Sequence, residues 1–207
     1  MESKTAEKDD EILEYARRVV EKEMDGVGKM AANIGTAFVA AVRCVMECAG
    51  RVIVVGVGKS GHVGKKIASS MASTGTPAFF VHGDEALHGD LGAITKDDVV
   101  ILVSNSGETR ELIAELPSLE QIGSRIVSIT SNEQSTIARF SDIHLSIGRT
   151  GESDHLGLAP SSSSTATLVL GDALALTVSS LRKFTKEQFA LFHPGGKLGE
   201  KLTGKAV

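Results

Sequence analysis

Three hydroxyl side chains gather in the segment Ser104-Asn105-Ser106-Gly107-Glu108-Thr109. An apolar run, 99–103, precedes this segment, and leucine and isoleucine residues recur at helical spacing over 112–119 after it, so the order is strand, turn and helix. Free backbone N–H groups at a helix start carry partial positive charge, and the hydroxyl groups add donors beside them. The turn is therefore predicted to bind an anion. Because Arg110 is the only cation nearby, the expected anion is a single phosphoryl group on a small metabolite.

Two titratable side chains in later loops could move protons. Glu152 belongs to the loop 148–157, which contains three glycines and follows the last apolar run. A carboxylate there could act as a general base, and a solvated loop carboxylate is an equally good interpretation from the spacing alone. His193 precedes a turn near the chain end, a position that a buried structural histidine seldom needs. The hydroxyl run 161–165 caps the next helix, lines the site, or does both.

A dense group of possible metal ligands lies in His82-Gly83-Asp84-Glu85-Ala86-Leu87-His88. Its order differs from the H-E-x-x-H zinc motif, because an aspartate precedes the glutamate. Clusters of this kind more commonly contain a helix cap and hydrogen-bonded histidines than a metal ion. We therefore expect Asp84 to cap a helix and no metal to bind.

The segment Gly56-Val57-Gly58-Lys59-Ser60-Gly61 satisfies the dinucleotide pattern G-x-G-x-x-G. Three observations disfavour a nucleotide site: Lys59 would lie inside the tight turn, no length remains for a substrate domain, and an anion turn already exists at 104–109. A phosphate-binding Walker loop is excluded, because Ile53 stands where its first glycine is required. We expect these glycines to allow close packing of a strand against a helix.

The pattern around these turns alternates between strands and helices. Short runs rich in valine and isoleucine are typical of strands covered on both faces. Amphipathic helices with apolar spacing over 12–20 and 27–45 precede them, and helices over 161–180 and from a Thr185 cap to Phe192 follow. The sequence predicts an α/β fold, a three-layer αβα sandwich of the flavodoxin type. The five expected parallel strands are Val52–Val55, Ala78–Val81, Val99–Val103, Ile126–Ile129 and Ile143–Ile147.

The composition narrows the classes of partner. With 207 residues, net charge −4 and 4% aromatic residues, the chain lacks the basic face and the stacking platforms of nucleic-acid binders. Its charged start and interrupted apolar runs favour neither an export signal nor a membrane anchor. Cys44 and Cys48 are expected to be buried thiols in a reducing cytoplasm. One domain over 1–207 is expected, with N-terminal helices over 1–50 and an α/β core with C-terminal helices over 51–207.

Six sequence blocks resemble the sugar isomerase (SIS) domain family, and within it the arabinose-5-phosphate isomerases. The resemblance covers nearly all of residues 51–202, and the N-terminal helices fit the same family. Any one block alone is weak, whereas six blocks in the right order are hard to attribute to chance. They are Gly58-Lys59-Ser60-Gly61-His62, Ser73-Thr74-Gly75-Thr76-Pro77, Glu85 with His88-Gly89-Asp90-Leu91-Gly92, Ser104-Asn105-Ser106-Gly107-Glu108, Leu156-Gly157-Leu158-Ala159-Pro160, and His193-Pro194-Gly195-Gly196.

The resemblance implies a reaction and a division of roles. Members of this family interconvert D-arabinose 5-phosphate and D-ribulose 5-phosphate through an enediol, without a metal or organic cofactor. By resemblance, Glu152 is the base that moves a proton between C1 and C2, and Lys59 stabilises the oxygen that gains charge. The residues that the resemblance assigns to the phosphate are Ser60, Ser104, Asn105, Ser106 and Thr109.

The resemblance also concerns the assembly. His193 matches a residue that is expected to reach in from a neighbouring subunit, and Glu85, His88 and Glu111 are expected to line the pocket. Shared sites imply an obligate oligomer, and the family expectation is a homotetramer. The resemblance points to lipopolysaccharide precursor (Kdo) synthesis, in the cytoplasm, as the use of the product.

Two features depart from the family pattern. Many members continue into a pair of cystathionine-β-synthase-type domains, whereas this chain stops at Val207, so we expect a short form without such regulation. Asp154-His155 stand where small or apolar residues are expected, which puts the substrate preference in doubt. Two alternatives therefore stay open: a 6-phospho-3-hexuloisomerase, and a sensor that binds a sugar phosphate without turnover.

Overall fold

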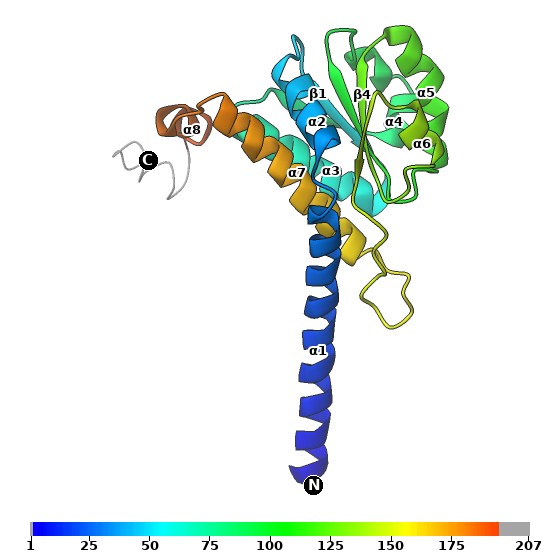
Figure 1. Ribbon diagram of the computed structural model, residues 1–207, viewed down its shortest axis with the longest axis vertical. Helices are drawn as coiled ribbons and strands as arrows, with labels where there is room; N and C mark the ends of the chain where they lie inside the picture. Colours follow the sequence, from blue (N-terminus) through cyan, green and yellow to red (C-terminus); the bar gives the residue numbers. More distant parts are fainter. Residues whose placement is uncertain (1, 195–207) are drawn as a thin grey trace.

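The computed structural model describes residues 2–194, and a five-stranded parallel sheet with the order β2-β1-β3-β4-β5 forms its centre (Figure 1). Every predicted strand is present, with ends that differ from the prediction by at most one residue. Residues 195–207, the end of the region 51–207 for which an α/β core with C-terminal helices was predicted, lie outside the described part of the chain. The strands are β1 Val52–Gly56, β2 Ala78–His82, β3 Val99–Val103, β4 Arg125–Thr130 and β5 Ile143–Ser146.

Helices cover both faces of this sheet. Side chains along β1 alternate between two apolar clusters, with Val52 and Val54 in the first and Ile53 in the second, because successive strand residues point to opposite faces. The predicted three-layer αβα sandwich is confirmed. The first cluster includes side chains of α1 Glu2–Ala31, α2 Thr36–Met46, α3 Gly58–Ser73 and α7 Ser162–Leu181; the second includes those of α4 Gly83–Leu87, α5 Arg110–Ile122 and α6 Thr136–Phe140, with the 3-10 helix η1 Asp90–Ala93 beside it.

The strand order places a switch point between β1 and β3. From β1 the chain passes through α3 to β2 on one side, and it then crosses to β3 on the other side. Because α3 and α5 pack on opposite faces, the loops that lead into them diverge. The two strands end in register, with Gly56 beside Val103. In open parallel sheets ligands bind in the crevice that such a divergence leaves at the carboxyl ends of the strands.

Helix α1 projects far beyond the sheet (Figure 1). It continues through Gly26 to Ala31, and the interruption before α2 falls at residues 32–35. The prediction of two N-terminal helices is confirmed, but the break lies later than the spacing indicated. Gly26 does not end the helix, because it is buried where α1 crosses α7. The projecting part exposes large apolar side chains, such as Ile12 and Met24.

Helix α7 is the one α-helix in residues 2–194 that alone is long and apolar enough to cross a membrane; residues 8–31 of α1 and α2 pass the same test only as a bent pair. The surroundings of α7 are those of a core helix. Gly171 lies so close to Ile67 of α3 that a β-carbon would collide with it. The neighbouring Asp172 forms an ion pair with Lys66. Packing within the protein thus explains the apolar composition of α7.

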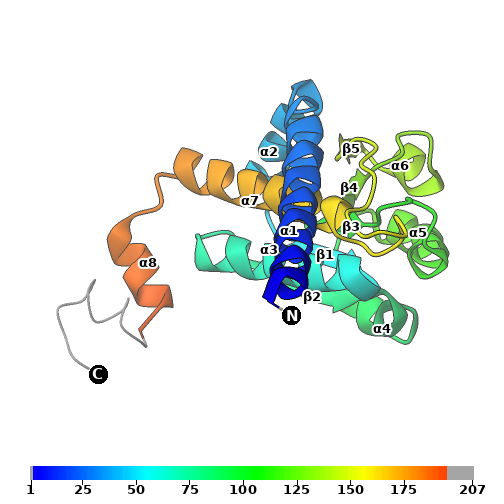
Figure 2. The same cartoon turned by 90° about the horizontal axis from the view of Figure 1, so that it is seen from below.

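A short helix, α8 Lys186–Phe192, follows α7. Thr185 caps it as predicted: its hydroxyl accepts the Gln188 N–H at 3.3 Å, and the Gln188 side chain accepts the Thr185 N–H at 2.8 Å. In both views α8 lies at the opposite end of α7 from the loop 148–160 (Figures 1 and 2).

Candidate active site

The turn 104–109 is built from its own hydroxyl groups. Ser104 is 1% exposed, and its hydroxyl lies 2.7 Å from that of Thr109 and accepts a backbone N–H of the turn at 3.0 Å. The Ser106 hydroxyl accepts a further N–H of the turn at 3.1 Å. Asn105 and Ser106 are exposed. Ser104 and Thr109 therefore hold the shape of the turn, while Asn105 and Ser106 present polar groups at its surface.

Contacts with the start of α6 also hold the turn 104–109 in place. Gly107 has φ +67° and lies against Ser135 so closely that a β-carbon would overlap the serine side chain. Its carbonyl oxygen accepts the Ile137 N–H at 3.1 Å. The Glu108 carboxylate accepts the Thr136 N–H at 2.7 Å, and this amide and the threonine hydroxyl lower the pKa of Glu108. These contacts fix the turn from behind.

Close glycine contacts set the loop between β1 and α3. A β-carbon on Gly61 would lie 3.0 Å from the Gly56 carbonyl oxygen, and Gly58 has φ +58°. The glycines therefore do what the sequence predicted, because they let α3 begin directly against β1. Lys59 and Ser60 stand in the first turn of α3 as a result.

A small cavity of about 40 Å³ joins both loops to the start of α7. Its walls come from the segments that follow β1, β3 and β5, so it lies at the switch point that the strand order indicates. Ammonium, amide and hydroxyl groups surround it. The lining residues are Lys59, Ser60, Val63, Asn105, Pro160, Ser163, Ser164 and Thr167.

Glu152 caps α7 beside this cavity. One of its carboxylate oxygens accepts the Ser161 N–H at 2.8 Å and the Ser163 N–H at 3.3 Å, and the other accepts the Ser163 hydroxyl. Negative charge is favourable at a helix N-terminus, where backbone N–H groups are unpaired. Ser163 thus binds Glu152 and also lines the cavity. Of the two purposes that the sequence left open for the hydroxyl run 161–165, the structure shows the lining of the cavity by Ser163 and Ser164, whereas the N-cap residue Ser161 makes no side-chain cap bond and Glu152 supplies the cap.

Helix α4 carries two further predicted residues at the carboxyl end of β2. Glu85 and His88 are exposed, the latter at the C-cap. The prediction that Asp84 caps this helix is wrong: His82 is the N-cap residue, and its Nδ1 accepts the Asp84 N–H at 3.3 Å. The helix begins at Gly83, which places Asp84 inside its first turn. Among the side chains that the structure describes, no group of three or more histidine, cysteine or acidic residues is suited to a metal ion.

Helix α5 carries one predicted and one unpredicted carboxyl group. Glu111 is half-buried in its first turn. Glu115, one turn further, is 0% exposed, and neither of its carboxyl oxygens has a hydrogen-bond partner within the described chain. Burial, and then the charge of Asp84, raise the pKa of Glu115 to about 8. The sequence held a signal for this burial, since Glu115 shares the inward helical spacing of Leu112 and Leu116.

His193 and Glu152 are not brought together within one chain. The His193 Nδ1 lies 2.8 Å from the Phe189 carbonyl oxygen, and the two rings stack with centroids 3.8 Å apart. The cavity adjoins the first turn of α7, whereas α8 follows the last turn, and a helix of 20 residues is about 30 Å long. A site that uses both residues has to take them from two copies. Gly195 and Gly196, which belong to the same sequence block, lie outside the described residues.

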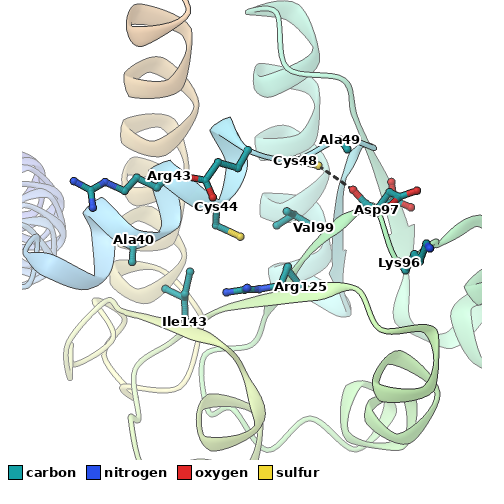
Figure 3. A pocket seen from close by; sticks show the side chains of 12 residues that line it. Ala40, Arg43, Cys44, Cys48, Ala49, Lys96, Asp97, Val99, Arg125 and Ile143 are labelled. Atoms are coloured by element: carbon teal, nitrogen blue, oxygen red, sulfur yellow. Dashed lines mark hydrogen bonds between the residues drawn. The ribbon is translucent and has the colours of Figure 1, made fainter.

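A second cavity, of about 530 Å³, opens at the amino ends of the strands (Figure 3). Cys44 and Cys48 line it together with Arg125 at the start of β4. The prediction that both thiols are buried is wrong, because each is only partly buried. Val45 and other side chains of α2 occupy the inner face of that helix beside Cys44, and Cys48 follows the end of the helix. Burial of part of the thiol raises the pKa of Cys44. This cavity is separated by the length of the strands from the turn 104–109.

The parallel sheet and the polar cavity at its switch point define a class, the doubly wound α/β proteins that bind small molecules between the ends of β1 and β3. Residues 45–177 match the SIS domain, and the chain belongs to the SIS domain family.

Similar proteins give this membership more detail. The chain is 50% identical over 192 residues to the arabinose 5-phosphate isomerase KdsD of Pseudomonas aeruginosa and 48% identical to that of Escherichia coli K12. The alignments cover 93% of this chain but 59% and 58% of those proteins, so the chain spans about three fifths of their length. The structure of Escherichia coli CFT073 c3406 in complex with arabinose 5-phosphate has a TM-score of 0.87 and 46% identity, and the match covers 89% of this chain and 98% of that chain.

Proposed function

We propose that this protein is an aldose–ketose isomerase that interconverts D-arabinose 5-phosphate and D-ribulose 5-phosphate through an enediol. One observation carries the proposal: Ser163 lines the polar cavity at the switch point and also binds the Glu152 carboxylate. A base and an anion site therefore adjoin each other. The similarity to the KdsD isomerases, and to a protein solved with arabinose 5-phosphate, supports the same substrate.

The phosphate binds in the crevice between the ends of β1 and β3. Ser60, Asn105 and Ser106 donate to it, while Ser104 and Thr109 keep the turn in shape through the bond between their hydroxyls. Hydrogen bonds to a charged group contribute about 1.5–3 kcal/mol each. Three or four such bonds hold the phosphate and use its binding energy to orient the reacting carbons.

The proton transfer runs between Glu152 and the first two carbons of the open-chain sugar. Glu152 removes the proton from C2 of the aldose, the electron pair of that bond forms the C1–C2 double bond, and the C1 oxygen gains charge. The hydroxyl proton on O2 passes to O1, Glu152 returns its proton to C1, and the electrons of the double bond form that new C1–H bond while the C2–O bond becomes the carbonyl of the ketose. A positioned base contributes about 100- to 10,000-fold. Lys59, which lines the cavity, donates to the oxygen that gains charge.

The proposal includes a homotetramer with shared sites. His193 comes from a neighbouring copy, because α7 separates it from Glu152 in its own chain. Glu85, His88 and Glu111, which follow β2 and β3, line the sugar. Helix α1 exposes large apolar side chains, and their burial against a neighbouring copy would be consistent with such an assembly. These are Ile12, Leu13, Val20 and Met24.

Only side chains of the protein take part in the proposed chemistry, so we include no metal or organic cofactor. From the family resemblance we propose a sugar phosphate as the small-molecule partner and a reaction in the cytoplasm. The net charge, the low aromatic content and the interrupted apolar runs of the sequence support neither nucleic acid nor a membrane as a partner. The same resemblance makes a lipopolysaccharide precursor, Kdo, the proposed destination of the product.

The purified protein and a panel of sugars test this function. We expect interconversion of arabinose 5-phosphate and ribulose 5-phosphate, slower turnover of 3-hexulose 6-phosphate, and none of unphosphorylated arabinose. Faster turnover of 3-hexulose 6-phosphate would assign the protein to the hexuloisomerases instead. Saturable binding of arabinose 5-phosphate without product, and without exchange of the C2 hydrogen with solvent, would make the protein a sensor.

A further inference from the structure

The C-terminal half of α1 packs against the two segments that hold Glu152 (Figures 1 and 2). Gly26 is buried there, and a β-carbon on it would lie 3.2 Å from the Ser162 Cβ and 3.3 Å from the Thr150 Cγ2. Thr150 belongs to the loop that carries Glu152, and Ser162 belongs to the first turn of α7. The lack of a side chain at Gly26 therefore lets α1 approach both segments at once.

Hydrogen bonds join the same three segments. The buried hydroxyls of Ser153 and Ser162 lie 2.6 Å apart, which links the residue after Glu152 to α7. The Thr165 hydroxyl donates to the Glu23 carboxylate of α1 at 2.7 Å. Because Glu152 also bonds to the first turn of α7, a shift of that turn relative to α1 moves the carboxylate.

We propose that Gly26, together with the bond between Glu23 and Thr165, positions Glu152 for proton transfer. This inference rests on the proposed isomerase activity. The distances from an added β-carbon are shorter than ordinary contacts, so a side chain at position 26 displaces its neighbours by a few tenths of an ångström. Ser163 follows Ser162 directly, binds Glu152 and lines the cavity. A displacement of Ser162 therefore moves both the base and the wall of the cavity.

Helix α1 offers a matched pair of variants. Gly26→Ala adds a β-carbon at this contact, and Gly28→Ala adds the same group where nothing lies within 4 Å. Both changes favour the helix intrinsically, because alanine replaces glycine in a helix interior. We expect kcat for arabinose 5-phosphate to fall roughly 3- to 10-fold in Gly26→Ala, with KM within about twofold, since a shift of about 1 Å costs roughly 100-fold. In Gly28→Ala we expect wild-type kcat.

The readouts are steady-state kinetics, solvent deuterium exchange at C2 and thermal unfolding of the full chain. Loss of kcat and slower exchange in Gly26→Ala, at an unchanged or higher Tm, support the positioning role. Wild-type kcat and exchange in Gly26→Ala would overturn it and leave the isomerase activity standing. Equal losses in both alanine variants would also overturn it, because they would trace to the helix and not to the contact. A wild-type protein without turnover would end the proposed function and this inference together.

If Gly26→Ala does not fold, a second variant tests whether α1 positions Glu152. Thr165→Val keeps the branched shape of the side chain and removes the hydroxyl that donates to Glu23. Its kcat is expected to fall about 2- to 5-fold at nearly constant KM, because the lost hydrogen bond acts on Glu152 only through the position of α7. Unchanged kcat and exchange in Thr165→Val would contradict the role of α1 in placing Glu152.

Discussion

Glu152 has two tasks in the proposed mechanism, because its carboxylate caps α7 and takes the substrate proton. The cap bonds come from Ser161 and Ser163, and a glutamine keeps one carbonyl oxygen that accepts from them. The cap can therefore survive a substitution that removes the base. The proposed role of Glu152 as the base can therefore be tested apart from its role as the cap of α7.

Glu152→Gln is expected to lower both turnover of arabinose 5-phosphate and solvent deuterium uptake at C2 by at least about 100-fold, since an amide does not accept the proton. Binding of arabinose 5-phosphate is expected to persist, because the phosphate contacts remain. Glu120→Gln, an exposed position on α5, is the matched control and should behave as wild type. Full exchange in Glu152→Gln would rule out the assignment of the base.

A substitution of Ser106 tests the proposed binding of phosphate by the turn 104–109. Ser106→Ala is expected to weaken binding of phosphorylated sugars by about tenfold, the equivalent of one hydrogen bond to a charged group. Residual affinity for unphosphorylated arabinose should not change. Ser69→Ala, at an exposed position of α3, controls for the loss of a surface hydroxyl, and calorimetry gives the affinities. Equal losses for both kinds of sugar would contradict a phosphate contact.

The packing of α4 on α5 buries Glu115, and this has a consequence for stability. The pKa of Glu115 rises from 4.5 to about 8 by burial, with the charge of Asp84 acting in the same direction. Between these pH values the folded chain keeps a proton that the unfolded chain has lost. Stability is therefore greatest below about pH 4.5 as far as this group is concerned, falls as the pH rises, and levels off above about pH 8.

Glu115→Gln removes this pH dependence, because the amide is neutral in both states. We expect Tm near that of the wild type at pH 5 and higher by roughly 8–15 °C at pH 8.5. Thermal unfolding at several pH values measures the difference, with Glu120→Gln on the same helix as the control. A constant offset between wild type and Glu115→Gln across this range would show that Glu115 does not titrate as its burial predicts.

The five strands and the capped helix α8 could be predicted, because each depends on contacts between neighbours in sequence. Valine-rich runs form strands wherever both faces are covered, and Thr185 reaches Gln188 within one turn. The apolar spacing over 12–20 and 27–45 implied a break between residues 20 and 27, where Gly26 lies, and this was wrong, because α1 continues to Ala31. Glycine weakens a helix by itself, but the close approach of α7 requires a residue without a side chain at that point. The cap on α4 also depended on the start of the helix, which the composition of the segment does not reveal.

The arrangement of the whole chain separates His193 from Glu152, and it also leaves the apolar face of α1 exposed. Both features point to function in an assembly, as proposed above. In a shared site one copy supplies the base and another the imidazole, so each residue can be removed from a different copy.

Mixed assemblies of Glu152→Gln and His193→Ala test this sharing. Each variant alone is expected to be nearly inactive. Co-expression in equal amounts should restore about one quarter of the wild-type activity, because half of the pairs are mixed and each mixed pair has one intact site out of two. Activity is measured after purification of assemblies that carry two different tags. No recovery in mixed assemblies would place both residues, or neither, in the site of one chain.

Local pattern and residue type are enough to predict the strands, the sheet type, the hydroxyl-rich turn and the residues that are able to do chemistry. The packing of the helices on the sheet sets which of those residues share a cavity: Lys59, Ser60 and Asn105 line it with Ser163, whereas His193 lies at the other end of α7. The same packing buries Glu115 without a hydrogen-bond partner in the described chain, and it brings Gly26 against the segments that hold the base. The reason is physical, since distances between segments far apart in sequence are set by how helices pack on the sheet, and no local pattern records that packing.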